Sequence, residues 1–265
     1  MKGLFDEVRA CLLITDAAEK VTRTRALQQA WLAGELNADV FGTPVPVEHP
    51  GRPEKPELVH PMAVPRRRLT SPQGIAAMLH AIAHIEFNAI NLALDAVQRF
   101  PDMPAQFYAD WLRVADEEAL HFDLINTHLK TLGYQYGDFP AHGSLWEMCV
   151  KTADDVMHRM ALVPRVLEAR GLDMTPEIQK KLAARGLDEA VSILDVILRD
   201  EVGHVEIGSR WFRYCCEQRG LDPYDTFFTL LKQHFPKGLF GPFNIDARRK
   251  GGFSEHELEI LTQGL

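Results

Sequence analysis

Apolar side chains recur every three or four residues along most of the chain, which is the period of an amphipathic α-helix. The longest stretches of this kind predict helices over about residues 72–99, 104–132, 152–185 and 188–218. Shorter helical segments are expected before residue 36, after Ser144, after Asp222 and after Ser254. The pattern therefore predicts an all-α fold.

Capping residues and glycines mark the ends of these predicted helices. Asp16 and Ser71 stand where N-caps are needed, and a proline follows Ser71 at the first helical position, where no backbone donor is lost. Gly133 is expected to end the helix over residues 104–132. Ser254 and Glu257 have the spacing of a capping box before a last short helix.

The third long stretch contains several residues that disfavour a helix. We expect Pro164 to kink a helix that starts near Thr152, because proline lacks a backbone donor. Gly171 is expected to interrupt this helix and Pro176 to restart it. Gly186 then turns the chain into the fourth long helix.

Eight of the sixteen prolines lie between Phe41 and Pro72, where the apolar period is lost. This composition predicts an extended arm that lies against the helices. The chain is accordingly expected to consist of N-terminal helices and a Pro-rich arm (1–71), a central set of helices (72–219) and a C-terminal helical extension (220–265). All three parts are expected to form one structural domain.

The charge of the chain limits its partners. A net charge of −8 and a pI near 5.8 argue against nucleic-acid binding over the whole surface. Two short basic strings, Arg66–Arg68 and Arg248–Lys250, still permit an anionic partner. A solvated basic cluster is the simpler interpretation of each string.

The sequence favours a cytoplasmic protein. Its first residues lack the pattern of a signal peptide, and we expect no apolar run of membrane-spanning length. None of the cysteines forms a Cys-x-x-Cys pair, so reduced thiols are expected at four positions: Cys11, Cys149, Cys215 and Cys216.

Two Glu-x-x-His motifs, Glu118–His121 and Glu201–His204, lie in the predicted helices. Residues three apart share one face of a helix, so both side chains of a motif can bind one ion. The motif alone is weak evidence, because a third match, Glu57–His60, is followed by Pro61 in the Pro-rich arm.

Each helical motif follows a further glutamate at nearly the same distance. Glu118 follows Glu86 by 32 residues, and Glu201 follows Glu168 by 33. The midpoint of each interval falls in a predicted turn, as antiparallel helices with their glutamates at one depth require. Two glutamates plus two Glu-x-x-His motifs are the ligands of dinuclear carboxylate sites in four-helix bundles. Buried ion pairs are the structural alternative.

On these residues the chain resembles the ferritin-like superfamily of dinuclear carboxylate proteins, over about residues 72–218. More closely, it is similar to a bacterial ferritin-like family catalogued as a domain of unknown function. Three strings carry the closer resemblance: His84–Glu86, Tyr136–His142 and Asp200–Val205. The resemblance implies a ferritin-like four-helix bundle with an N-terminal helical extension, the Pro-rich arm and C-terminal helices.

The resemblance also implies a cofactor of two iron ions per chain, or of manganese or both metals. Its expected ligands are Glu86, Glu118, His121, Glu168, Glu201 and His204. Glu118 and Glu201 are placed to bridge or chelate, Glu86 and Glu168 to hold one metal each, and His121 and His204 to supply one imidazole per ion. Asp200 resembles an aspartate that orients a ligating histidine, and Glu117 has the corresponding place in the first motif.

Other residues are expected near the site without binding the metal. Tyr136, Asp138 and His142 lie in a loop rich in turn formers, where they can line the mouth of a site or serve simple turn packing. Gly203 leaves space inside the second motif, for a close helix or for O₂. His80 and His84 are either a second ligand pair or ordinary core or surface histidines.

The metal centre itself is the only catalytic group that the sequence indicates. Ribonucleotide reductase subunits carry a radical tyrosine where Ile125 stands, and the Cys-rich donor of rubrerythrins is absent. We therefore expect an O₂-activating hydroxylase or oxidase that acts on a small molecule with an external reductase. The alternatives are a ferroxidase or peroxide scavenger, and a metal-stabilised interaction module. A tRNA substrate is a lesser alternative, because one ferritin-like family hydroxylates a tRNA base.

Overall fold

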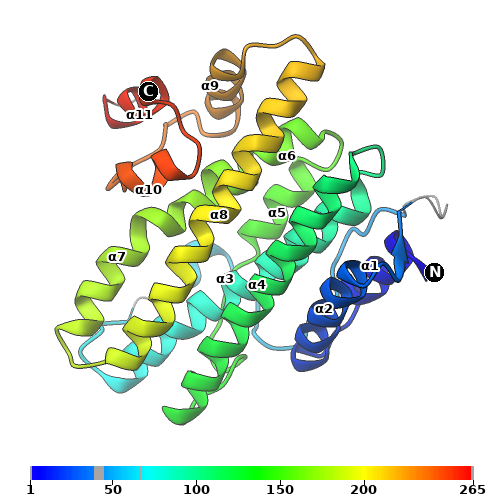
Figure 1. Cartoon of the computed structure of the whole chain (residues 1–265). Coiled ribbons are helices and arrows are strands. Elements are labelled where there is room, and N and C mark those ends of the chain that lie inside the picture. Colours follow the sequence, from blue (N-terminus) through cyan, green and yellow to red (C-terminus); the bar gives the residue numbers. More distant parts are fainter. Residues whose placement is uncertain (1, 39–44, 66, 264–265) are drawn as a thin grey trace. The chain divides into compact units, whose positions relative to one another are not determined.

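The computed structural model describes residues 2–38, 45–65 and 67–263, and its regular elements are almost entirely helices (Figure 1). The predicted all-α fold is confirmed at this level. The chain divides into two compact units, residues 1–150 and 151–265. The division at residues 71 and 219 that the sequence indicates stays a prediction.

The first unit is built on a helical hairpin. Helix α3 (Pro72–Arg99) packs against α4 (Ala105–Thr131), and the turn between them contains Pro101 and Pro104. Ser71 accepts a hydrogen bond from the backbone of Gly74 at 3.1 Å, so the predicted N-cap is confirmed. Gly133 has a positive φ of 80° just after α4, which is the backbone conformation that glycine adopts most readily.

Two N-terminal helices cover this hairpin. Helix α1 (Leu4–Leu12) packs on α3, and α2 (Ala17–Leu32) packs on α4. Asp16 caps α2 as predicted, accepting a bond from the backbone of Glu19 at 2.8 Å. A short parallel pair, β1 (Lys2–Gly3) and β2 (Leu36–Asn37), was not predicted.

The described part of the Pro-rich arm has a single short helix, a 3₁₀ turn over Pro61–Ala63. The arm is attached to the helices by Lys20 of α2, which is fully buried. Its ammonium group donates to the carbonyl oxygens of Leu12 and Gly51 and to the side chain of Asn91. Phe41, the first residue of the predicted arm, and Arg66 of the first basic string lie outside the described residues. The unit also contains most of α5 (Ser144–Lys151).

The second unit contains another hairpin. Its first arm is α6 (Val156–Leu162), a π-helix over Val163–Glu168 and α7 (Ala169–Ala183). All three segments pack on α8 (Asp188–Gln218). The helix continues through Gly171 and Pro176, so the predicted interruption and restart there are wrong. Asp155, not Thr152, caps α6, and its side chain accepts from the backbone of Met157 at 2.8 Å.

Three further helices complete the second unit: α9 (Pro223–His234), α10 (Ile245–Lys250) and α11 (Glu255–Gln263). The capping box is confirmed, because Ser254 donates to Glu257 and accepts from its backbone. Helix α10 was not predicted. It contains the basic string, of which Arg248 pairs with Asp173 and Arg249 with Asp246 and Glu255. That string is therefore largely neutralised within its own unit.

By length and composition alone, α3 could cross a membrane, which corrects the expectation that no apolar run is long enough. Its most apolar window is 67% buried inside the structure, as the core helix of a soluble protein also would be. One such helix is weak evidence for a membrane span.

Candidate metal centre

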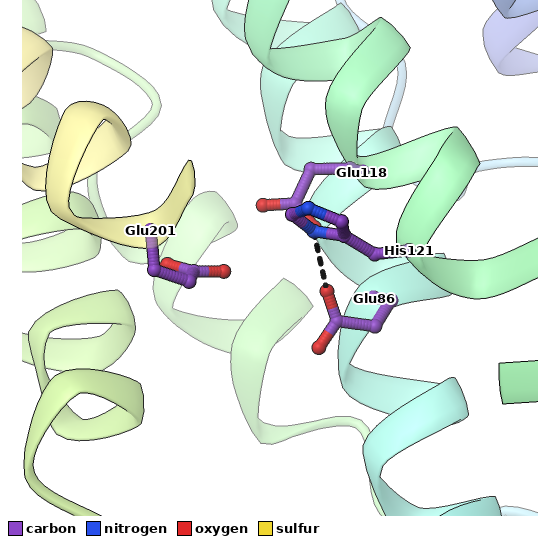
Figure 2. A group of neighbouring side chains, drawn as sticks. All are labelled: Glu86, Glu118, His121 and Glu201. Carbon is purple, nitrogen blue, oxygen red and sulfur yellow. Dashed lines mark hydrogen bonds and ion pairs between the residues drawn. The ribbon is translucent and has the colours of Figure 1, made fainter. Parts of the chain in front are cut away.

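The first hairpin brings three of the predicted ligands together. Glu86 lies midway along α3, and Glu118 and His121 lie one turn apart on the facing side of α4. The His121 Nδ1 atom is 3.2 Å from Glu86 Oε2 and 3.5 Å from Glu118 Oε2. All three side chains are buried, at most 3% exposed. They converge on one point, as Figure 2 shows.

The donor atoms of these three residues belong to a group that could hold a metal ion. Carboxylate oxygens and an imidazole nitrogen are ligands that iron and manganese accept, and Nδ1 already faces both carboxylates. Two carboxylates in a buried place repel each other unless a proton or a cation lies between them. A divalent cation would remove that repulsion.

The second unit places the other three predicted ligands. Glu201 and His204 lie one turn apart on α8, with Glu201 Oε1 3.8 Å from His204 Nδ1. Glu168 is the last residue of the π-helix on the opposite arm of that hairpin. The exposed fractions of the three residues are 7%, 0% and 9% respectively. These three residues repeat the types and the burial of the first three, but only Glu201 belongs to the group of side chains that could hold a metal ion; Glu168 and His204 are not part of it.

The π-helix at Glu168 has a visible cause. Pro164 cannot donate the backbone hydrogen bond of a regular α-helix, and its ring lies directly against Gly208 of α8. A β-carbon at position 208 would overlap that ring. Wide turns of this kind occur mostly within α-helices and often at functional sites. Pro164 was the sequence signal for it, although only a kink was predicted.

A group of four buried side chains could hold a metal ion: Glu86, Glu118, His121 and Glu201. Figure 2 shows these four, with Glu86 on α3, Glu118 and His121 on α4, and Glu201 on α8. The group contains each of the two glutamates that were predicted to bridge.

The predicted orienting residues lie beside the motifs. Glu117 is half-buried, and its Oε1 is 3.8 Å from the Nε atom of Arg113. Asp200 accepts hydrogen bonds from Arg199 at 2.8 and 3.1 Å. Their action on the ligating histidines stays a prediction.

One protein-family model matches most of the chain. A family model described as "Protein of unknown function (DUF455)" matches residues 13–259. The chain belongs to the DUF455 family. An uncharacterized protein of Haemophilus influenzae is 56% identical over 218 residues, which are 80% of this chain and 76% of that protein. No solved structure matches.

The Tyr136–His142 string of this DUF455 chain lies in the loop after α4 and is held by α3. His84 Nδ1 is 2.9 Å from the Tyr136 hydroxyl, and its Nε2 is 3.1 Å from the carbonyl oxygen of His142. His80 Nε2 accepts from the backbone N–H of Gly137 at 2.9 Å. The two histidines therefore anchor the loop, which fits the expectation of core histidines.

Burial changes the acid–base behaviour of these loop contacts. It lowers the pKa of both His80 and His84 to about 4, and it raises the pKa of Tyr136. All three are uncharged at neutral pH. Asp138 and His142 are exposed on the loop, and Gly203 is half-buried in α8. A role for these residues at the mouth of the site stays a prediction.

Proposed function

We propose that the two half-sites of this protein form one dinuclear iron or manganese centre of the ferritin-like kind. In this proposal α3, α4, α8 and the arm from α6 to α7 are the four helices of the bundle. The observation that carries the proposal is the buried group of Glu86, Glu118, His121 and Glu201, to which both Glu-x-x-His motifs contribute. A structural ion pair needs no second copy of such a motif.

Each of the six proposed ligands has a specific role in this centre. Glu86 and Glu168 would hold one ion each, and Glu118 and Glu201 would bridge or chelate. His121 and His204 supply one nitrogen per ion, which with the carboxylates favours iron or manganese over a closed zinc site. Asp200 and Glu117 orient the histidines and keep their rings in the tautomer that presents Nδ1.

We further propose that the protein is an oxidoreductase that activates O₂ for a small organic substrate. A reduced metal pair bound by these residues would supply electrons for O₂, and an external reductase would be the electron donor. Helices α1 and α2, which pack on the first hairpin, are additions that a bare iron-storage bundle does not need. The cysteines, none of which forms a disulfide, fit a cytoplasmic place for this chemistry.

The test is a single turnover with reduced metal. Protein loaded without oxygen with two Fe(II) per chain is mixed with O₂, and both O₂ consumption and total iron uptake are measured. We expect O₂ consumption without further iron uptake. E118Q should lose both the iron and the O₂ reaction, while E206Q should retain them, because Glu206 pairs with exposed Arg210 on the surface of α8.

Other outcomes would favour the other functions. Uptake of many more than two iron ions per chain would indicate an iron-handling or ferroxidase role. Stable binding of two ions with no reaction toward O₂ or peroxide would indicate a metal-stabilised interaction module. Either result would contradict the oxygenase proposal without contradicting the proposed dinuclear centre.

A further inference from the structure

A pocket of about 520 Å³ lies within the second unit, beside the π-helix. This volume is in the range of small-molecule sites. Val166 and Leu167 of the π-helix form one side, and the segment between α9 and α10 forms the other. Its walls are mainly apolar, and the side chains that make them so are Val166, Leu167, Phe235, Leu239, Phe240 and Phe243.

Phe240 lines the pocket but is not covered by the other side chains around it. Its side chain is 70% exposed. An exposed aromatic ring lacks the favourable free energy that burial of its apolar surface would provide. An apolar ligand in the pocket would cover it.

The charged residues of the pocket are all basic. Arg170, Lys237 and Arg248 line it, and its lining contains no aspartate or glutamate among the described residues. Burial lowers the pKa of His234, the other titratable lining residue, so that it is neutral at pH 7.

The nearest carboxylate does not neutralise these cations. Asp173 accepts two hydrogen bonds from Arg248, at 2.9 and 2.7 Å, and is 3.5 Å from an Arg170 nitrogen. One carboxylate therefore faces two guanidinium groups, and Lys237 has no ion pair within the described residues. The pocket keeps a net positive charge.

Arg248 also has an unused donor. The residue is 1% exposed, and its Nη1 atom has no hydrogen-bond partner in the described part of the chain. A buried donor without an acceptor destabilises the folded protein, because it has lost its hydrogen bonds to water. A ligand oxygen next to the Asp173–Arg248 pair would reduce that destabilisation.

We propose that this pocket binds a small organic anion, a carboxylate carried on an apolar body. The carboxylate would lie by Arg170 and Lys237, whose charges it balances, and the apolar body would cover Phe240 and Leu239. Inorganic phosphate would leave the apolar walls uncovered, and a neutral ligand would leave the cations unbalanced. The site goes beyond the metal centre and needs no metal to bind its ligand.

The test is calorimetric titration of the full-length protein, as purified, with octanoate and with 1-octanol. We expect one octanoate per chain and at least tenfold weaker binding of the alcohol, which has the same apolar tail without the charge. K237Q should weaken octanoate about tenfold, whereas K232Q, the same change at an exposed lysine outside the pocket, should leave binding unchanged. F240A should weaken octanoate and octanol alike.

Three results would overturn the proposal. They are no octanoate binding at millimolar concentration, equal affinity for octanoate and octanol, and equal effects of K237Q and K232Q. Lys237 and Lys232 are exposed and lack described ion pairs, so neither variant should fail to fold. A failed dinuclear centre would leave these binding results unchanged, so the two proposals can fail separately.

Discussion

His80 and Glu86 lie on the same helix, both buried, and have different partners. His80 Nε2 accepts a hydrogen bond from the backbone of Gly137, which requires the ring nitrogen to be unprotonated. Glu86 faces the Nδ1 atom of His121. The His80 contact fixes a loop, and the Glu86 contact belongs to the candidate metal centre. The sequence alone does not distinguish these two roles, because both residues are polar positions in an otherwise apolar helix.

The His80 contact predicts a specific dependence of stability on pH. Burial lowers the folded-state pKa of His80 to about 4, below its unfolded value of 6.5. Between these values the unfolded chain binds more protons, so the stabilisation is complete above pH 6.5 and is lost as pH falls toward 4. The free energy of unfolding in urea should therefore fall from pH 7 to pH 5.

The variant H80Q isolates this effect, because a glutamine oxygen can accept the Gly137 bond and does not titrate in this range. We expect the stability difference between wild type and H80Q to change in favour of the variant as pH falls from 7 to 5. Other titrating groups are common to both proteins and cancel. A difference that is constant over this range would mean that His80 does not couple folding to protons.

The grouping of Glu86, Glu118 and His121 could be predicted from the sequence because their spacing follows from helix geometry. Glu118 and His121 must share a face, and Glu86 must lie opposite them if the turn is midway. The anchoring of the loop could not be predicted. It depends on a backbone N–H and a carbonyl in a segment without periodicity, and only the folded chain brings Gly137 and His142 to α3.

At the scale of elements, local capping signals were sufficient for some helices. Asp16, Ser71 and Ser254 all cap as predicted, since each bond lies within one turn. Gly171 and Pro176 were misjudged. Gly171 lies in open space near the start of α7, and helix packing outweighs its weak propensity there. The π-helix could not be predicted from the local sequence, because it depends on the contact of Pro164 with Gly208 of another helix.

The packing of Pro164 on Gly208 predicts an unusual response to two identical substitutions. G208A should destabilise the protein by about 1–3 kcal/mol, because the new methyl group overlaps the proline ring. G171A should stabilise it by up to about 1 kcal/mol, because that position has open space and alanine favours the helix. Urea unfolding of both variants measures the difference.

Each variant serves as a control for the other, because the gain in helix propensity from glycine to alanine is the same in both. If G208A were as stable as G171A, Pro164 and Gly208 would not be in tight contact and the π-helix would need another cause. G208A should also weaken metal binding at Glu168 more than G171A does, because the overlap acts on the segment that ends there.

At the scale of the whole molecule, each compact unit carries one hairpin and three of the six proposed ligands. This arrangement explains why the chain repeats a pattern of a glutamate followed by Glu-x-x-His. Arg248 and Arg249 of the second basic string form ion pairs inside their own unit.

The most direct test of the dinuclear centre is the metal content of the full-length protein, measured by elemental analysis after expression with iron and manganese available. We predict close to two iron or manganese ions per chain, and less than half an ion in E201Q. E206Q, the same change five residues further along α8, should keep the wild-type content. No metal, one stoichiometric zinc, or equal metal content in E201Q and E206Q would contradict the account.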